Sequence, residues 1–200
     1  MFNYEEEVQK YKIQQMKKNK ERIIQEINNA KTRQKIENFI KRNDNEFTYD
    51  EVINGILTNP IILACFAIAP SRQSIEEKFT LQMLGLKKLS QSGKNSIRFT
   101  YEGDIVHKKN SGAVTKSVDC IYKNVYTTLK YTHEDGGSQN NQENDVRNFL
   151  LFGSKKNKVG AILDGAYWTK EKILSLREEF KNNSNVIFIT STEEILNGVM

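Results

Sequence analysis

The first forty residues show a helical pattern of apolar and polar positions. Residues 4–42 contain neither Pro nor Gly, are rich in Glu, Lys and Gln, and place apolar residues at helical spacing. This pattern predicts one long helix or two helices in series. The apolar stripe is thin, so we expect part of the helix to project, to pack on a partner chain or to lie along a ligand. A break follows, and Thr48 with Glu51 matches the capping box of a new helix.

The rest of the chain alternates between helical and β-type patterns. Residues 72–89 predict an amphipathic helix, and three β-rich segments follow it, with a hairpin turn near Lys123 and Asn124. A strand, helix and strand close the chain, and their lengths favour a parallel or mixed sheet with a right-handed crossover. The β-type segments are 96–109, 116–124, 125–132, 159–168 and 185–190, and the later helical segments are 140–153 and 169–183.

Composition places the chain among soluble globular proteins. Its 200 residues are 38% hydrophobic and 28% charged, which suits one domain with an appendage. The most apolar run, residues 60–70, is too short to span a bilayer and predicts a buried core segment. The N-terminus has no apolar signal region, so we expect a cytoplasmic protein without a membrane partner. Cys65 and Cys120 lie in apolar or strand segments and are expected to be packed and reduced.

The positive charge of the chain lies in its N-terminal part. Residues 1–43 hold 11 Lys and Arg against 6 Glu, whereas the remaining 157 residues hold 19 cations and 19 acids. A basic surplus of this kind can attract the phosphate groups of a nucleic acid. It also fits a helix face that is simply solvated. Charge alone therefore leaves both interpretations open.

Asp119 and Lys130 carry the candidate chemistry. Strand alternation puts Lys130 on a mixed polar face of the segment 125–132. A short turn lets Asp119, on the preceding strand, come within reach of it. A carboxylate there can bind Mg²⁺, and a nearby lysine can orient or help to deprotonate the water that attacks a phosphate. The same two residues could also form an ordinary cross-strand ion pair.

A resemblance to a known family adds to this picture. The phrases "APSRQSIEEK", "TLKYTHEDGGSQNNQENDV" and "VGAILDGAYW", with Asp119 and Lys130 on neighbouring strands, resemble the PD-(D/E)XK nuclease superfamily and in particular its type II restriction endonucleases. The resemblance covers about residues 47–197. It implies a mixed α+β fold of the restriction-endonuclease type, in which helices flank a central mixed sheet. We accordingly expect a basic helical extension over 1–46 and a nuclease-like domain over 47–200.

The resemblance also implies roles for individual residues. Asp119 takes the position of the first metal-binding acid, Lys130 that of the catalytic lysine, and the Leu129 carbonyl that of a further metal ligand. The chain departs from the family at Thr128, where the usual residue is Asp or Glu. A second acid must therefore come from elsewhere, or metal binding is weakened. Glu77 is the preferred substitute, ahead of the alternatives Glu76 and Asp104.

DNA contacts and the overall activity follow from the same resemblance. Arg72, Gln73, Gln139 and Gln142 are expected to contact DNA, although each can equally brace or cap its helix. The implied function is that of a restriction-modification nuclease, which hydrolyses phosphodiester bonds of double-stranded DNA at a specific sequence with Mg²⁺ as cofactor. Cutting both strands needs two active sites, so we expect a homodimer or a heteromeric partner subunit. The alternative is a non-catalytic subunit that binds DNA or a partner through a nuclease-like fold.

Overall fold

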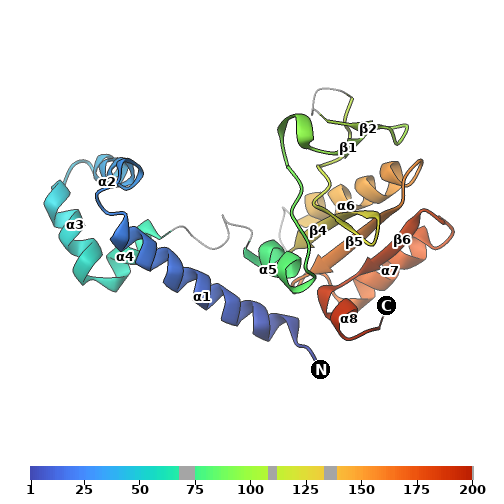
Figure 1. Cartoon of the computed structure of the whole chain (residues 1–200), viewed down its shortest axis with the longest axis horizontal. Coiled ribbons are helices and arrows are strands. Elements are labelled where there is room, and N and C mark those ends of the chain that lie inside the picture. Colours follow the sequence, from blue (N-terminus) through green and yellow to red (C-terminus); the bar gives the residue numbers. More distant parts are fainter. Residues whose placement is uncertain (68–74, 108–111, 133–138, 200) are drawn as a thin grey trace. The chain divides into compact units, whose positions relative to one another are not determined.

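The structure is a computed structural model that describes residues 1–67, 75–107, 112–132 and 139–199, without the side chains of residues 139 and 140. The chain divides into two compact units. We call residues 6–75 the helical unit, and residues 1–5 together with 76–200 the sheet unit. The boundary expected at residue 46 falls inside the helical unit, between its second and third helices (Figure 1).

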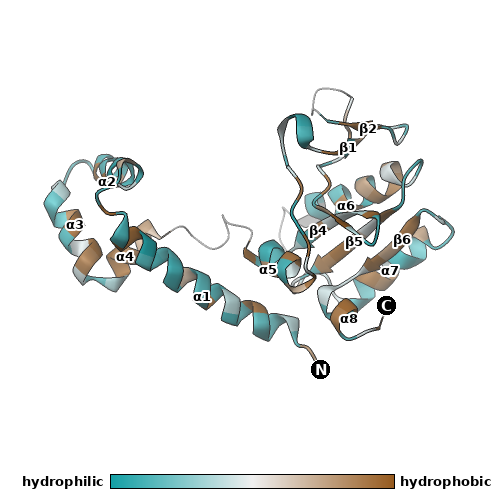
Figure 2. Ribbon diagram, in the orientation of Figure 1, coloured by the Kyte–Doolittle hydropathy of each residue, from teal (hydrophilic) through white to brown (hydrophobic). Residues whose placement is uncertain are grey.

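The helical unit folds around its own apolar core. Its helices are α1 (Tyr4–Gln25), which begins in the sheet unit, α2 (Ala30–Arg42), α3 (Tyr49–Thr58) and α4 (Pro60–Phe66). The pattern over residues 4–42 therefore corresponds to two helices in series. In Figure 2, α1 is mainly hydrophilic, α3 mixes hydrophilic and apolar residues, and α4 is largely apolar. The buried core residues are Ile23, Ile36, Val52, Ile56, Phe66 and Ala67.

Caps determine where the helices of this unit begin. The Asn29 side chain accepts hydrogen bonds from the backbone N–H groups of Lys31 and Thr32 at the start of α2. At α3, the Thr48 hydroxyl accepts from the Glu51 backbone N–H at 3.3 Å, and the Glu51 carboxylate accepts from the Thr48 backbone N–H at 2.7 Å. This is the capping box predicted from the sequence, which is confirmed.

One expectation about the apolar run 60–70 is wrong. Phe66 and Ala67 are buried, but Ile61 is 75% exposed and Cys65 is exposed as well. The run forms a short helix from Pro60, and a helix packed on one side turns its other side chains to solvent. Cys120 is buried as expected. Residues 68–70 lie outside the described part of the chain.

The sheet unit is a mixed α/β structure. Its central sheet has the strand order β3–β4–β5–β6, and β1 and β2 form a separate antiparallel pair. β3 pairs antiparallel with β4, whereas β4, β5 and β6 run parallel. The elements are α5 (Ile75–Met83), the 3-10 helix η2 (Gly93–Asn95), β1 (Arg98–Phe99), β2 (Ile105–Val106), β3 (Cys120–Tyr122), β4 (Val125–Tyr131), α6 (Gln139–Gly153), β5 (Val159–Asp164), α7 (Lys170–Phe180), β6 (Val186–Thr190) and α8 (Thr192–Leu196).

The turn between β3 and β4 has the expected position. Lys123 and Asn124 adopt φ angles of 48° and 61°, and positive φ at both central residues is the geometry of a tight hairpin turn. Helices α6 and α7 then make the two crossovers that parallel strands require. The predicted mixed sheet with helical crossovers is confirmed at this level.

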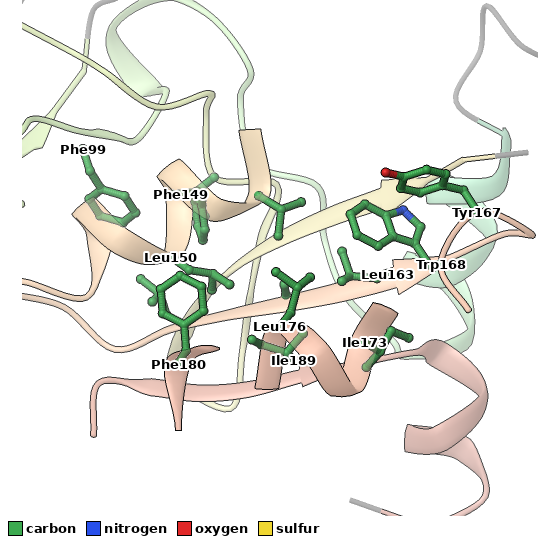
Figure 3. Close-up of a cluster of buried hydrophobic side chains, with 14 residues drawn as sticks. Phe99, Phe149, Leu150, Leu163, Tyr167, Trp168, Ile173, Leu176, Phe180 and Ile189 are labelled. Atoms are coloured by element: carbon green, nitrogen blue, oxygen red, sulfur yellow. The ribbon is translucent and has the colours of Figure 1, made fainter. Parts of the chain in front are cut away.

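Helices cover both faces of the central sheet. Figure 3 shows one apolar core, in which side chains of α6 and α7 pack on Leu163 of β5 and Ile189 of β6. On the opposite face, Leu81 of α5 packs with Cys120, Leu129 and Ile162. Ile162 and Leu163 are neighbours in sequence and point into different cores, as strand alternation requires. The buried sheet is thus a rigid support for residues at its edges.

None of the helices in the described ranges is both long enough and apolar enough to cross a membrane.

Candidate functional site

Asp119 lies at the point where the chain enters β3. Its backbone N–H donates to the Thr127 carbonyl of β4 at 3.0 Å, so the chain is already held against β4 there. Its side chain is 5% exposed. The carboxylate oxygen Oδ2 accepts hydrogen bonds from the Leu129 backbone N–H at 2.8 Å and from the Thr128 hydroxyl at 3.1 Å. No described residue donates a hydrogen bond to Oδ1, which makes that oxygen available to a ligand.

The electrostatics of Asp119 connect it with Lys130 and Glu77. Burial raises the pKa of Asp119, because the charged form loses its hydration. The positive charge of Lys130 and the two hydrogen bonds lower this pKa, and the negative charge of Glu77 raises it further. Lys130 itself is half-buried on β4, on the same face as Thr128. Lys130 and Glu77 are therefore close enough to act on Asp119 electrostatically, and among the described residues neither forms an ion pair with it.

The three candidates for the second acid occupy different places. Glu77 is on α5, where its carboxylate pairs with the Lys88 ammonium group at 2.8 Å. Glu76 is buried, and its negative charge acts on Tyr131, which is on the opposite face of β4 from Lys130. Asp104 lies between β1 and β2, and its exposed carboxylate pairs with Lys156 at 2.6 Å. The negative charge of Glu77 acts on Asp119 and raises its pKa.

The oxygen atoms around Asp119 could bind a cation that receives its remaining ligands from water or from a substrate. The N–H and C=O of one strand residue face the same neighbouring strand. Since the Leu129 N–H reaches Asp119, its carbonyl oxygen is directed to the same side of β4. Thr128 adds a hydroxyl in place of a carboxylate. Among the described residues, no three His, Cys, Asp or Glu side chains gather closely enough to enclose a metal.

The residues expected to contact DNA are only partly visible. Arg72 and Gln73 lie outside the described residues, as does the side chain of Gln139. The Gln142 side chain accepts a hydrogen bond from the Thr132 hydroxyl at 2.6 Å, and that hydroxyl also accepts one from the Trp168 indole N–H at 3.2 Å. Gln142 thus braces the end of β4 against α6.

A second buried acid of the sheet unit is Asp164. It ends β5 and is 6% exposed. Its carboxylate accepts hydrogen bonds from the Thr192 N–H at 2.9 Å, the Thr192 hydroxyl at 2.6 Å and the Thr80 hydroxyl at 3.2 Å. Burial nevertheless raises its pKa to about 6. An acid at the end of an otherwise apolar strand was the only signal for this cluster.

No protein-family model, curated protein or solved structure matches the chain. An account of its function therefore depends on the geometry and chemistry of the site itself.

Proposed function

We propose that this chain is a Mg²⁺-dependent endonuclease of the restriction type, which hydrolyses phosphodiester bonds in double-stranded DNA at a specific sequence. The observation that carries the proposal is the buried Asp119 carboxylate, one oxygen of which accepts no hydrogen bond from the described residues, together with the charges of Lys130 and Glu77 that act on it. The order of α5, the strands up to β4, α6 and β5 is in keeping with the helix, meander, helix and strand of the PD-(D/E)XK nucleases.

The residues at this edge fit a Mg²⁺ ion that also binds the substrate. Mg²⁺ prefers oxygen ligands and commonly uses one or two carboxylates together with phosphate oxygens and waters. Asp119 and the Leu129 carbonyl would hold the ion. Glu77 would become a further ligand if its carboxylate left the ion pair with Lys88 and bound the ion instead. When bound, the ion would supply positive charge that stabilises the pentacoordinate phosphate and lowers the pKa of bound water.

The protein groups have separate tasks in this proposal. The Leu129 N–H and the Thr128 hydroxyl fix the orientation of the Asp119 carboxylate. Lys130 orients the attacking water and stabilises the negative charge that develops on the phosphate. The β-sheet supplies rigidity, because Val125–Thr127 of β4 pair with β3 and Tyr126–Tyr131 pair with β5. Two copies of this site are needed to cut both strands, so a homodimer or a partner subunit is part of the proposal.

One observation favours a second function, a subunit that binds DNA or a partner without cutting. Thr128 stands where the family has an acid, and its hydroxyl donates to Asp119 instead of binding a cation. Glu77, the substitute acid, is paired with Lys88. A single carboxylate binds Mg²⁺ more weakly than two, so the nuclease-like fold could retain binding without catalysis.

Incubation of the purified chain with a phage genome tests both functions. The endonuclease predicts discrete fragments with Mg²⁺ and intact DNA with EDTA. Retained DNA binding without cleavage, over a range of Mg²⁺ and Mn²⁺ concentrations, would instead support the non-catalytic subunit. Absence of both cleavage and binding would contradict each proposal.

A further inference from the structure

Helix α2 is fixed to the helical unit by one face only. Thr32 and Ile36 are buried, and Phe39 and Ile40 pack partly buried against the core shared with α3 and α4. The Asn29 cap satisfies its first N–H groups. The helix is therefore held rigidly, in a unit that has its own core and is separate from the sheet unit.

The other face of α2 presents a row of cations and amides to solvent. Its members are all exposed and are spaced three or four residues apart, so they lie along one side of the helix. They are Lys31, Gln34, Lys35, Asn38 and Arg42. Lys41 flanks this row, whereas Arg33 lies on another side of the helix; both are exposed. The helix contains five cations against one acid, Glu37.

The cations of α2 have one acid on their own helix, whereas those of α1 share their helix with four. Within the described residues, none of the five forms an ion pair. In contrast, Lys10, Lys88, Lys156 and Arg177 each pair with a carboxylate. Unpaired like charges along one helix repel one another, so this arrangement costs free energy that a polyanion would recover.

The amides in the row are placed for a more specific contact. The Gln34 amide nitrogen donates to Glu37 at 3.3 Å and to the Asn38 side-chain oxygen at 3.5 Å, both long and exposed hydrogen bonds. Such bonds exchange readily for stronger ones. Gln and Asn side chains form paired hydrogen bonds with the adenine edge in the major groove.

We infer that the exposed face of α2 docks in the major groove of double-stranded DNA, with Lys31, Lys35 and Arg42 on phosphates and with Gln34 and Asn38 toward the bases. An α-helix is about 10–12 Å wide, and the major groove of B-DNA is about 12 Å wide. The inference rests on the proposed function for the choice of DNA as the polyanion. It requires neither Mg²⁺ nor cleavage.

The salt dependence of DNA binding tests this inference. Binding of a fluorescent duplex is measured in EDTA at several salt concentrations, for the wild type and the variant K31Q/K35Q/R42Q. The slope of log K against log salt is negative, and each lost phosphate contact makes it less negative by about 0.9. The triple variant should therefore bind with a slope that is less negative by about 2 to 3 than that of the wild type. The matched control K17Q/K18Q/K20Q removes three cations from α1 and should leave the slope nearly unchanged. Circular dichroism verifies that both variants are folded.

Several results would overturn the inference. They are absence of binding by the wild type, an unchanged slope in the α2 variant, or an equal loss in the α1 control. Equal affinity for double-stranded RNA would also overturn it, because the A-form major groove is too deep and narrow for a helix. If the α2 variant still cuts DNA and its salt dependence of binding equals that of the wild type, the docking inference fails and the proposed function stands. If the wild type binds through α2 but never cuts, the docking inference stands and the proposed endonuclease function fails.

Discussion

At the scale of single residues, the two buried acids of the sheet unit differ in their surroundings. Asp119 accepts from two donors, has one oxygen without a hydrogen bond from the described residues, and lies near Lys130 and Glu77. Asp164 accepts from three donors, which come from α5 and α8. The first arrangement leaves one carboxylate oxygen without a donor among the described residues, whereas the second joins α5 and α8 to the end of β5. The proposed chemistry therefore uses Asp119, whereas Asp164 connects elements of the fold.

The raised pKa of Asp119 predicts a pH dependence of cleavage. Only the ionised carboxylate binds a cation well, so activity should fall with decreasing pH, and the fall should begin above the ordinary pH range of an aspartate. The variant Thr128→Val removes a hydrogen bond that lowers this pKa. Its acid limb should therefore move to higher pH in a profile of cleavage rate against pH. A limb at lower pH than in the wild type would be inconsistent with the assigned role of Thr128.

Asp164 predicts a pH dependence of stability. Its pKa is about 6 in the folded chain, and about 3.9 is usual for an unfolded one. Between these values the folded chain binds more protons, so the free energy of unfolding falls as pH rises. The group accounts for up to about 3 kcal/mol over this window. Urea unfolding of the wild type and of Asp164→Asn between pH 4 and 7 measures this contribution. The same change of the free energy of unfolding with pH in both proteins would refute the prediction.

Residue by residue, the sequence predicted the acid and lysine at one sheet edge but not the environment of either acid. Strand parity and a short turn were enough to bring Asp119 near Lys130, because both are local features of one hairpin. The Asp164 cluster joins residues more than 80 positions apart, such as Thr80 and Asp164. A contact of this kind depends on how helices pack on the sheet, and no local pattern encodes it.

At the scale of elements, caps and turns determine where helices and strands end. The capping box at Thr48 starts α3, and the two positive-φ residues Lys123 and Asn124 turn β3 into β4. Both were predicted, because both depend on residues adjacent in sequence. The strands β1 and β2 contain only two residues each, much shorter than the predicted segment 96–109. Strand length depends on pairing partners, which periodicity does not show.

The capping box gives a prediction for the helical unit. Thr48→Ala removes the side-chain acceptor for the Glu51 N–H, and the loss of such a cap costs about 0.5–2 kcal/mol. Thermal or urea unfolding of the variant should show this loss, whereas the control Thr48→Ser, which keeps the hydroxyl, should remain close to the wild type. Equal stability of Thr48→Ala and Thr48→Ser would show that the cap contributes little.

Gly165 gives a prediction for the end of β5. It has φ +97°, and a Cβ atom there would collide with the Thr132 carbonyl oxygen. Gly165→Ala should therefore destabilise the chain by about 2 kcal/mol or more. Gly85→Ala is the matched control, since Gly85 has φ +65° but open space around its Cβ position. If both variants lose the same stability in urea, the collision has no effect beyond the positive φ.

At the scale of the whole molecule, the two units divide the features that matter for function. The sheet unit carries Asp119, Lys130 and Glu77, and the helical unit carries the exposed cations of α2. The basic surplus of residues 1–43 was visible in the sequence, but its concentration on one exposed helix face was not. Residues 47–75 belong to the same unit as the basic helices, because Ile36, Val52 and Phe66 share one core. The sequence alone did not show this.

The central claim is that Asp119 and Lys130 act together in Mg²⁺-dependent cleavage. The most direct measurement is the rate of phage DNA cleavage by the wild type, Asp119→Asn, Lys130→Ala and the control Lys158→Ala, which changes an exposed lysine before β5. We expect both site variants to lose at least about 100-fold in rate while folding normally, and the control to cut at the wild-type rate. Undiminished cleavage by either folded site variant would contradict the account.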